Sequence, residues 1–161
     1  MIRERVKKTV REVNKKHNDA GVKNILIVDD EKFVLTVIAK GLSIYLKDSF
    51  HILTAENGEE AVEILKSHPV VFIVTDLNMP IMNGYELSGY LKKNYPDTPV
   101  FLMTSDLTSE VQERLRPMGV RQFFEKPFSF QKLALNIAEE LEDALGVCTH
   151  EETSSAIALG R

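Results

Sequence analysis

The stretch Val70-Val71-Phe72-Ile73-Val74-Thr75-Asp76 decides the fold of this chain. Six apolar or β-branched residues in a row are typical of a strand that is buried on both faces of a parallel sheet. The acid that follows them then lies at the C-terminal end of that strand. Open α/β sheets bind their ligands at this edge, so the sequence predicts a functional site built around Asp76.

A second apolar run, Asn24-Ile25-Leu26-Ile27-Val28, also ends in acids, Asp29 and Asp30. If the two strands are neighbours in the sheet, three carboxylates converge on one point. Like charges at that distance cannot all stay ionised unless a cation balances them. Asp29, Asp30 and Asp76 are therefore predicted to form a divalent-metal site around a candidate nucleophile.

Strands and helices alternate from the first of these runs onward. Apolar runs predict strands over residues 25–28, 50–55, 70–75, 100–103 and 121–124. Apolar residues at helical spacing predict helices over residues 32–47, 59–66, 84–94, 109–116 and 130–145. The first of these helices has its apolar positions at Phe33, Val34, Val37, Ile38, Leu42 and Tyr45. Pro117 is predicted to stop the fourth helix.

This alternation predicts an α/β fold with a doubly wound, five-stranded parallel sheet and helices on both of its faces. Parallel strands need crossover connections, and the predicted helices supply them. The first, third and fourth strands are the most apolar and are predicted to be central. The second is less apolar and is predicted to lie nearer an edge.

The segment before the first strand is predicted to be an added helix. Residues 2–16 place a narrow apolar stripe at spacings of three or four, formed by Ile2, Val6, Val10 and Val13. This stripe can pack on the domain or on a second copy. The first 23 residues carry eight basic and three acidic side chains, a net charge of +5. Because the whole chain has a net charge of −4, the remainder carries −9. A basic arm can bind nucleic acid or acidic partners, but a solvated helix is the favoured interpretation.

Composition is that of one globular domain. The chain has 161 residues, of which 43% are hydrophobic and 27% charged. We expect no membrane span, because no apolar stretch approaches about 18 residues, and no signal peptide, because MIRERVKK lacks an apolar core. One cysteine, Cys148, excludes an internal disulfide framework. A cytoplasmic location is the expectation.

Hydroxyl and ammonium groups follow the last two strands, at Thr104-Ser105 and Lys126-Pro127. Taken singly, each is more often a cap or a solvated surface group. Together with the acids, they indicate chemistry at one edge of the sheet. Mg²⁺ prefers oxygen ligands, a carboxylate can become an aspartyl phosphate, and phosphoryl transfer needs positive charge and hydrogen-bond donors around the phosphoryl oxygens. Lys126 and Thr104 match those last two needs.

Four segments carry a resemblance to a known family: VDDE at residues 28–31, TDLNMPIMNG at 75–84, MTS at 103–105 and FFEKPF at 123–128. Over about residues 23–146 the chain resembles the receiver domain of two-component response regulators, the CheY-like family. The resemblance implies a flavodoxin-like sheet with strand order 2-1-3-4-5. We divide the chain accordingly into an N-terminal helical extension (1–22), a receiver domain (23–146) and a flexible C-terminal tail (147–161).

The resemblance also implies roles for individual residues. Asp76 matches the phosphoacceptor, which takes a phosphoryl group from a histidine kinase or a histidine phosphotransfer protein. Asp29 and Asp30 match the acid pair that holds Mg²⁺ together with Asp76, and the backbone carbonyl of Asn78 matches a further ligand. Lys126 matches the lysine that contacts the phosphate, and its peptide bond to Pro127 is expected to be cis.

Two further positions are implied to govern switching and phosphate lifetime. Thr104 matches the switch hydroxyl, and Phe123 falls on the aromatic switch position, which often holds Tyr; the alternative is a core phenylalanine. Asn78 and Asp106 match the two variable positions that tune the lifetime of the aspartyl phosphate. Such a protein is not an enzyme beyond catalysing its own phosphorylation and dephosphorylation.

Output and rival functions follow from the same residues. Fifteen residues after Gly146 are too few for an output domain, so the expected output is an unknown downstream protein or a further phosphorelay member. A homodimer would form through the 109–146 surface or the N-terminal helix.

An aspartate-nucleophile phosphohydrolase needs a second acid where Asn78 stands. A flavodoxin-like cofactor binder needs a phosphate loop where Asp29 and Asp30 stand. Membrane partners are not expected, and nucleic acid is disfavoured.

Overall fold

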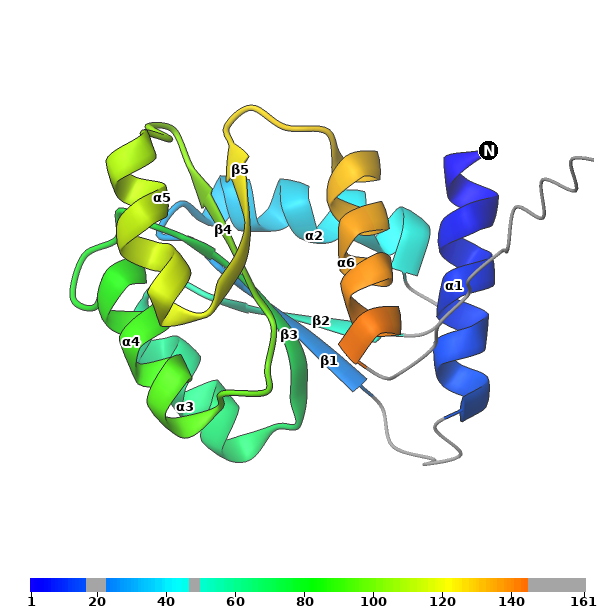
Figure 1. The fold of residues 1–161 in the computed structure, drawn as a ribbon, viewed down its shortest axis with the longest axis horizontal. Coiled ribbons are helices and arrows are strands. Elements are labelled where there is room, and N and C mark those ends of the chain that lie inside the picture. Colours follow the sequence, from blue (N-terminus) through cyan, green and yellow to red (C-terminus); the bar gives the residue numbers. More distant parts are fainter. Residues whose placement is uncertain (17–22, 47–49, 145–161) are drawn as a thin grey trace, which may run out of the picture.

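The computed structural model describes residues 1–16, 23–46 and 50–144. Its centre is a five-stranded sheet in the order β2-β1-β3-β4-β5, and every pair of neighbours is parallel (Figure 1). The strands are β1 (Lys23–Val28), β2 (Phe50–Ala55), β3 (Val70–Asp76), β4 (Val100–Thr104) and β5 (Val120–Glu125). The predicted fold and strand order are confirmed, including the central place of β1, β3 and β4 and the edge place of β2.

Helices cover both faces of this sheet. One layer holds α1 (Ile2–Lys16), α2 (Lys32–Leu46) and α6 (Phe130–Ala144). The other holds α3 (Gly58–Ser67), α4 (Gly84–Asn94), α5 (Ser109–Leu115) and the short 3-10 helix η1 (Arg116–Met118). Figure 1 shows α6 and α1 side by side in the first layer and α3, α4 and α5 grouped in the second.

Alternate residues of the central strands build two separate cores. In β1, Ile25 and Ile27 face the layer with α2 and α6, whereas Leu26 and Val28 face the layer with α3 and α4. All four side chains are fully buried. Because consecutive side chains of a strand point to opposite faces, only a strand without polar interruptions fits between two helical layers. The continuous apolar runs therefore place β1 and β3 in the middle, with their terminal acids side by side.

The helix over residues 109–116 differs from its prediction. The α-helix ends at Leu115, and Pro117 lies inside the 3-10 turn of η1 rather than directly after the helix. Proline has no N–H to donate but fits the first turn of a helix, where that donor has no partner. Gly119 then ends the turn with a φ of 86°, a conformation that glycine adopts without strain.

The inward face of α2 also differs from the predicted pattern. Its buried apolar residues are Leu35, Ile38, Leu42 and Leu46. Phe33, one of the predicted apolar positions, is 78% exposed. The sequence pattern did not distinguish this face, because α2 is apolar around much of its circumference.

The predicted N-terminal helix over residues 2–16 is confirmed, and it packs on its own domain. Val6 is fully buried within the core shared with α2 and α6, and Thr9 is nearly so. Arg5 forms an ion pair of 2.8 Å with Glu139 of α6. The side chains of Ile2, Val10 and Val13 lie outside the described residues, as do residues 17–22 and 145–161. Within the described part of the chain, no helix combines the length and the apolarity that crossing a bilayer requires.

Candidate functional site at the carboxyl edge of the sheet

Lys126 joins the two strand-end acids that the sequence singled out. Its Nζ lies 2.7 Å from Oδ2 of Asp29 and 2.9 Å from Oδ1 of Asp76. Asp29 follows β1, Asp76 ends β3 and Lys126 follows β5, so the side chain reaches past the end of β4. The Lys126-Pro127 peptide bond is cis, as predicted. The structure thus brings Asp29, Asp76 and Lys126 together, as expected.

Backbone amides orient the second oxygen of each carboxylate. The amide of Glu31 donates to Oδ1 of Asp29 at 2.9 Å, and the amide of Asn78 donates to Oδ2 of Asp76 at 3.1 Å. Both bonds span two residues, the local pattern in which an aspartate closes a turn on its own backbone. Each carboxylate is therefore held by one ammonium contact and one amide contact, and its direction is set before any ligand arrives.

Burial and pairing act in opposite directions on the charges of this site. Burial raises the pKa of Asp76 above its ordinary value; the hydrogen bond from Lys126 opposes the shift, and the nearby charge of Asp29 reinforces it. Burial alone would lower the pKa of Lys126, but its hydrogen bonds to Asp29 and Asp76 outweigh that effect and raise it. The ammonium is thus kept charged, while Asp76 carries a negative charge that its surroundings only partly stabilise.

Lys126 pairs with Asp29 and Asp76 and not with Asp30. Its side chain is exposed, whereas that of Asp29 is fully buried. Among the residues that the structure describes, no group of three or more His, Cys, Asp or Glu side chains is arranged to hold a metal ion. The chemistry of the donors nevertheless suits Mg²⁺, because Asp29 and Asp76 present oxygens and their two negative charges share one ammonium. One uncompensated negative charge remains at the pair, and Asp30 adds another at its rim.

Thr104 lies directly behind the ion-paired group, at the end of β4. It is fully buried, and its backbone carbonyl accepts a 2.8 Å hydrogen bond from the Lys126 amide. Its hydroxyl oxygen accepts a 3.2 Å bond from the amide of Asp106. The side chains of Asn78 and Asp106, the two predicted lifetime positions, are both exposed at this edge. Their effect on a bound phosphoryl group stays a prediction.

Phe123 is half-buried on β5, where it pairs in register with Leu102 of β4. The guanidinium of Arg116 lies over its ring, 5.5 Å from the ring centroid. This distance falls within the range of a cation–π interaction. Its neighbour Phe124 is the buried one of the pair and packs in the opposite core. The predicted switch role of Phe123 stays a prediction.

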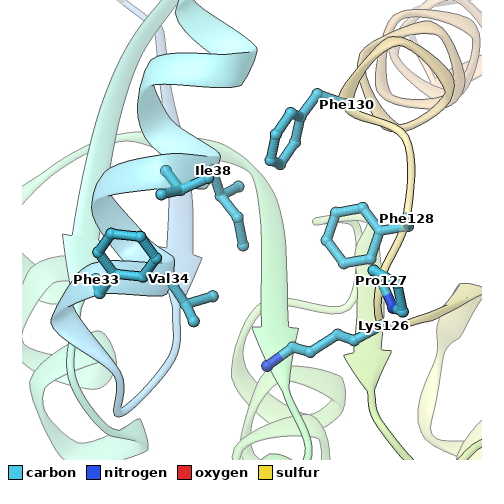
Figure 2. A pocket seen from close by; sticks show the side chains of 8 residues that line it. Phe33, Val34, Ile38, Lys126, Pro127, Phe128 and Phe130 are labelled. Carbon is cyan, nitrogen blue, oxygen red and sulfur yellow. The ribbon is translucent and has the colours of Figure 1, made fainter.

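Sequence reasoning missed an apolar groove beside Lys126. The groove separates α2 from the connection between β5 and α6. Figure 2 shows Phe33, Val34 and Ile38 on the α2 side and Pro127, Phe128 and Phe130 on the other. Lys126 also lines it, and its volume is about 190 Å³. The sequence shows the aromatic residues Phe128 and Phe130 after β5. Only the tertiary packing shows that their rings line a groove.

Replacing Lys126 by Met is expected to lower the free energy of unfolding by about 2 kcal/mol, since two buried carboxylates lose a charged hydrogen-bond donor. The raised pKa of Lys126 makes this contribution fully present below its unfolded value of 10.5. It is lost as pH rises through the folded-state pKa, so the two proteins should converge only at alkaline pH. Urea unfolding of both proteins at a series of pH values, with a chelator present, measures the loss of stability and its pH dependence. Lys32→Met is the control. The ion pair between Lys32 and Glu56 is exposed, so its loss should change the free energy of unfolding little. Equal losses in both variants would contradict the prediction.

Comparisons with known proteins agree with this geometry. The model of the response regulator receiver domain matches residues 25–138. A chemotaxis protein CheY homologue from Campylobacter jejuni is 37% identical over 131 residues, covering 79% of this chain and 95% of that protein.

Two solved structures are also similar. A CheY-like receiver domain protein from Methanospirillum hungatei superposes with a TM-score of 0.72 at 22% identity, over 80% of this chain and all of that one, which supports the fold alone. The beryllofluoride-activated NtrC4 receiver domain dimer has a TM-score of 0.68 at 28% identity, over 75% of this chain and 98% of that one. The chain therefore belongs to the response regulator receiver domain family of two-component signalling systems.

Proposed function

We propose that this chain is a phosphoacceptor in two-component signalling, and that Asp76 takes a phosphoryl group from a phosphohistidine of a kinase or phosphotransfer protein. The observation that carries the proposal is the contact of one ammonium, that of Lys126, with both Asp29 and Asp76. A nucleophile for phosphoryl transfer needs a fixed direction and nearby positive charge. Asp76 has both.

Each neighbour of Asp76 has a distinct task in this proposal. One oxygen of Asp76 attacks phosphorus, and the bond from phosphorus to the donor's leaving atom breaks as the new P–O bond forms. The Lys126 ammonium, 2.9 Å from Asp76, is placed to stabilise charge on the phosphoryl oxygens. The buried hydroxyl of Thr104 can donate a hydrogen bond to one of those oxygens, because in the structure it accepts from Asp106 and its proton is free to turn.

Mg²⁺ is the proposed cofactor. Asp29, Asp30, Asp76 and the backbone carbonyl of Asn78 are the residues that would hold it. When bound, the ion neutralises negative charge on the carboxylates and on the phosphoryl oxygens. Asp30 is exposed at the rim, where its carboxylate is accessible to an ion from solvent.

The aspartate-nucleophile phosphohydrolase is the weaker candidate. Hydrolysis by that route uses an acid placed to protonate the leaving group and then activate water. Asn78 stands at that position, and its amide cannot exchange a proton in this way. The proposed role is therefore that of a phosphorylated signal carrier, acting on a downstream protein or passing the phosphate to another phosphorelay member.

The proposal is tested by incubating the protein with acetyl phosphate and Mg²⁺ and following its intact mass. We expect a gain of one phosphoryl group, which is lost when the ion is chelated before the donor is added. Borohydride reduces an aspartyl phosphate to homoserine, so peptide mapping after reduction should place the change at residue 76. Phosphate on another residue, or none with Mg²⁺ present, would refute the assignment.

Thr104→Ala is expected to separate phosphorylation from its structural consequence. The variant keeps Asp76 and Lys126, so it should still accept phosphate. It lacks the hydroxyl that we propose draws β4 toward the phosphoryl group, which is the step that would let the Phe123 ring move. Hydrogen exchange over residues 109–144 should then change on phosphorylation in the wild type and much less in the variant. A full wild-type change in Thr104→Ala would contradict this coupling; Thr108→Ala, at the exposed cap of α5, is the control.

Dimerisation, where it occurs, is proposed to use the α5-β5-α6 surface rather than α1. Val6 and Thr9 of α1 are already buried against the chain's own α2 and α6, which removes that part of the apolar stripe from contact with a second copy. Arg121 and Gln122 of β5 instead lie beside Glu140 and Asn136 of α6 on the opposite flank. The similar NtrC4 receiver structure is described as a dimer, which supports self-association within the family.

A further inference from the structure

The apolar groove between α2 and the β5-α6 connection has a composition that departs from that of the surrounding edge. Seven of its eight lining residues are apolar, and the eighth is Lys126. On the α2 side, Phe33 is 78% exposed at the rim. On the other side, the Phe130 ring packs on Gly41, where even an added Cβ would lie 2.7 Å from the ring. Gly41 belongs to α2, so the Phe130 ring bridges α6 and α2 and closes that part of the groove.

Lys126 connects this groove to Asp76. Figure 2 shows its side chain running along one end of the groove, with the ammonium pointing toward the α2 side. That ammonium is the group that contacts Asp76 at 2.9 Å. A molecule seated against the stem of Lys126 therefore has its apolar part in the groove and its other end at the phosphorylation site. The single charged group in the lining is a cation, but Asp29 and Asp76 already share it. A phosphoryl group at this end therefore requires the proposed Mg²⁺ to balance the two carboxylates.

The size of the groove limits the apolar part. A cavity of about 150 Å³ lined by apolar side chains holds a benzene molecule, and this groove has about 190 Å³. A phenyl ring or a short branched chain fits, whereas the methyl group of acetate leaves most of the volume to water.

We propose that the groove selects small phosphodonors, namely acyl phosphates whose acyl group is aromatic or branched, in preference to acetyl phosphate. This rests on the proposed phosphorylation of Asp76. In the transfer, an Asp76 oxygen forms a bond to phosphorus as the bond between phosphorus and the acyl oxygen breaks. The donor's carboxylate leaves with the electron pair of that bond, and its apolar group occupies the groove throughout.

The test compares benzoyl phosphate with acetyl phosphate by the second-order rate constant of phosphorylation. Burial of much of one ring predicts a ratio of about tenfold in favour of the aromatic donor. Phe33→Ser should lower this ratio at least threefold and leave the acetyl phosphate rate unchanged. Ile44→Ser is the matched control, because Ile44 lies on the same helix, is 54% exposed and does not line the groove. Dividing the wild-type ratio by the Phe33→Ser ratio cancels the difference in intrinsic reactivity between the two donors.

A binding measurement keeps the proposal separate from phosphorylation itself. Benzylphosphonate and methylphosphonate, which cannot transfer a phosphoryl group, are titrated while the methyl resonances of Val34 and Val37 are followed. We expect benzylphosphonate to shift both resonances at lower concentration than methylphosphonate does, and Phe33→Ser to abolish the difference. If acetyl phosphate reacts but the donor ratio is the same in wild type and Phe33→Ser, the groove proposal is wrong and the phosphoacceptor function stands. If neither donor reacts, the proposed function fails, and the titration alone decides whether the groove binds the apolar group.

Discussion

Asp76→Asn is expected to lose all phosphoryl incorporation from acetyl phosphate, the largest effect that any single substitution should have here. Asn is close in shape to Asp and keeps an oxygen that can accept from the Asn78 amide, so the fold should persist. The amide oxygen is a far weaker nucleophile than a carboxylate and yields no stable acyl phosphate. Intact mass after incubation with donor and Mg²⁺ measures the loss, and circular dichroism verifies the fold.

Two other acids at the same edge are the controls for this substitution. Asp106→Asn removes an exposed carboxylate and should leave incorporation intact. Asp29→Asn removes the buried partner of Lys126 and should slow incorporation without moving it to another residue. Incorporation that persists in Asp76→Asn would show that Asp76 is not the acceptor.

Gly84→Ala is expected to have the largest effect on stability, a loss of about 3 kcal/mol in the free energy of unfolding. An added Cβ would lie 2.5 Å from the Asp76 carbonyl oxygen and 2.8 Å from the Leu77 Cα. Both are backbone atoms, so no side-chain rotation relieves the clash. The Gly84 amide also donates to the Leu77 carbonyl at 2.8 Å, which ties the start of α4 to the residues that follow Asp76. Phosphorylation should therefore slow as well.

Gly89→Ala is the matched control on the same helix. Nothing lies within 4 Å of its would-be Cβ, and the residue is exposed in the middle of α4. Alanine is better than glycine in a helix interior, so this variant should gain about 0.5–1 kcal/mol. Urea unfolding of both variants decides the matter. Equal effects of the two substitutions would show that the close approach at Gly84 does not limit stability.

Local patterns predicted most of the architecture, because the period of apolar residues reports directly on which face is buried. The helix over residues 84–94 and the strand over residues 50–55 have the predicted bounds. The errors fell where a local rule had two outcomes. Pro117 can end a helix or begin a 3-10 turn, and the structure has the turn. On α2, apolar residues on several faces left the exposed position of Phe33 undetermined.

The sequence predicted which residues form the candidate site more completely than it predicted how their side chains are arranged. Strand-end positions of Asp29, Asp76, Thr104 and Lys126 follow from the alternation of strands and helices, because parallel strands end at a common edge. The four motifs in order then identify the family. The predicted convergence of three acids was realised for the two buried ones, whereas Asp30 stayed at the exposed rim.

The sequence alone determined which side chains lie at the carboxyl edge of the sheet. This depends only on the direction of the strands and on the spacing of their buried apolar residues. What required the folded chain was which groups touch. Lys126 meets an acid 97 residues earlier because the crossovers place β1 and β3 together and leave room for one long side chain past β4. The groove between Phe33 and Phe130 likewise exists only once α2 and α6 lie on the same face. Contacts of this kind depend on distances between segments that share no local pattern, so packing alone decides them.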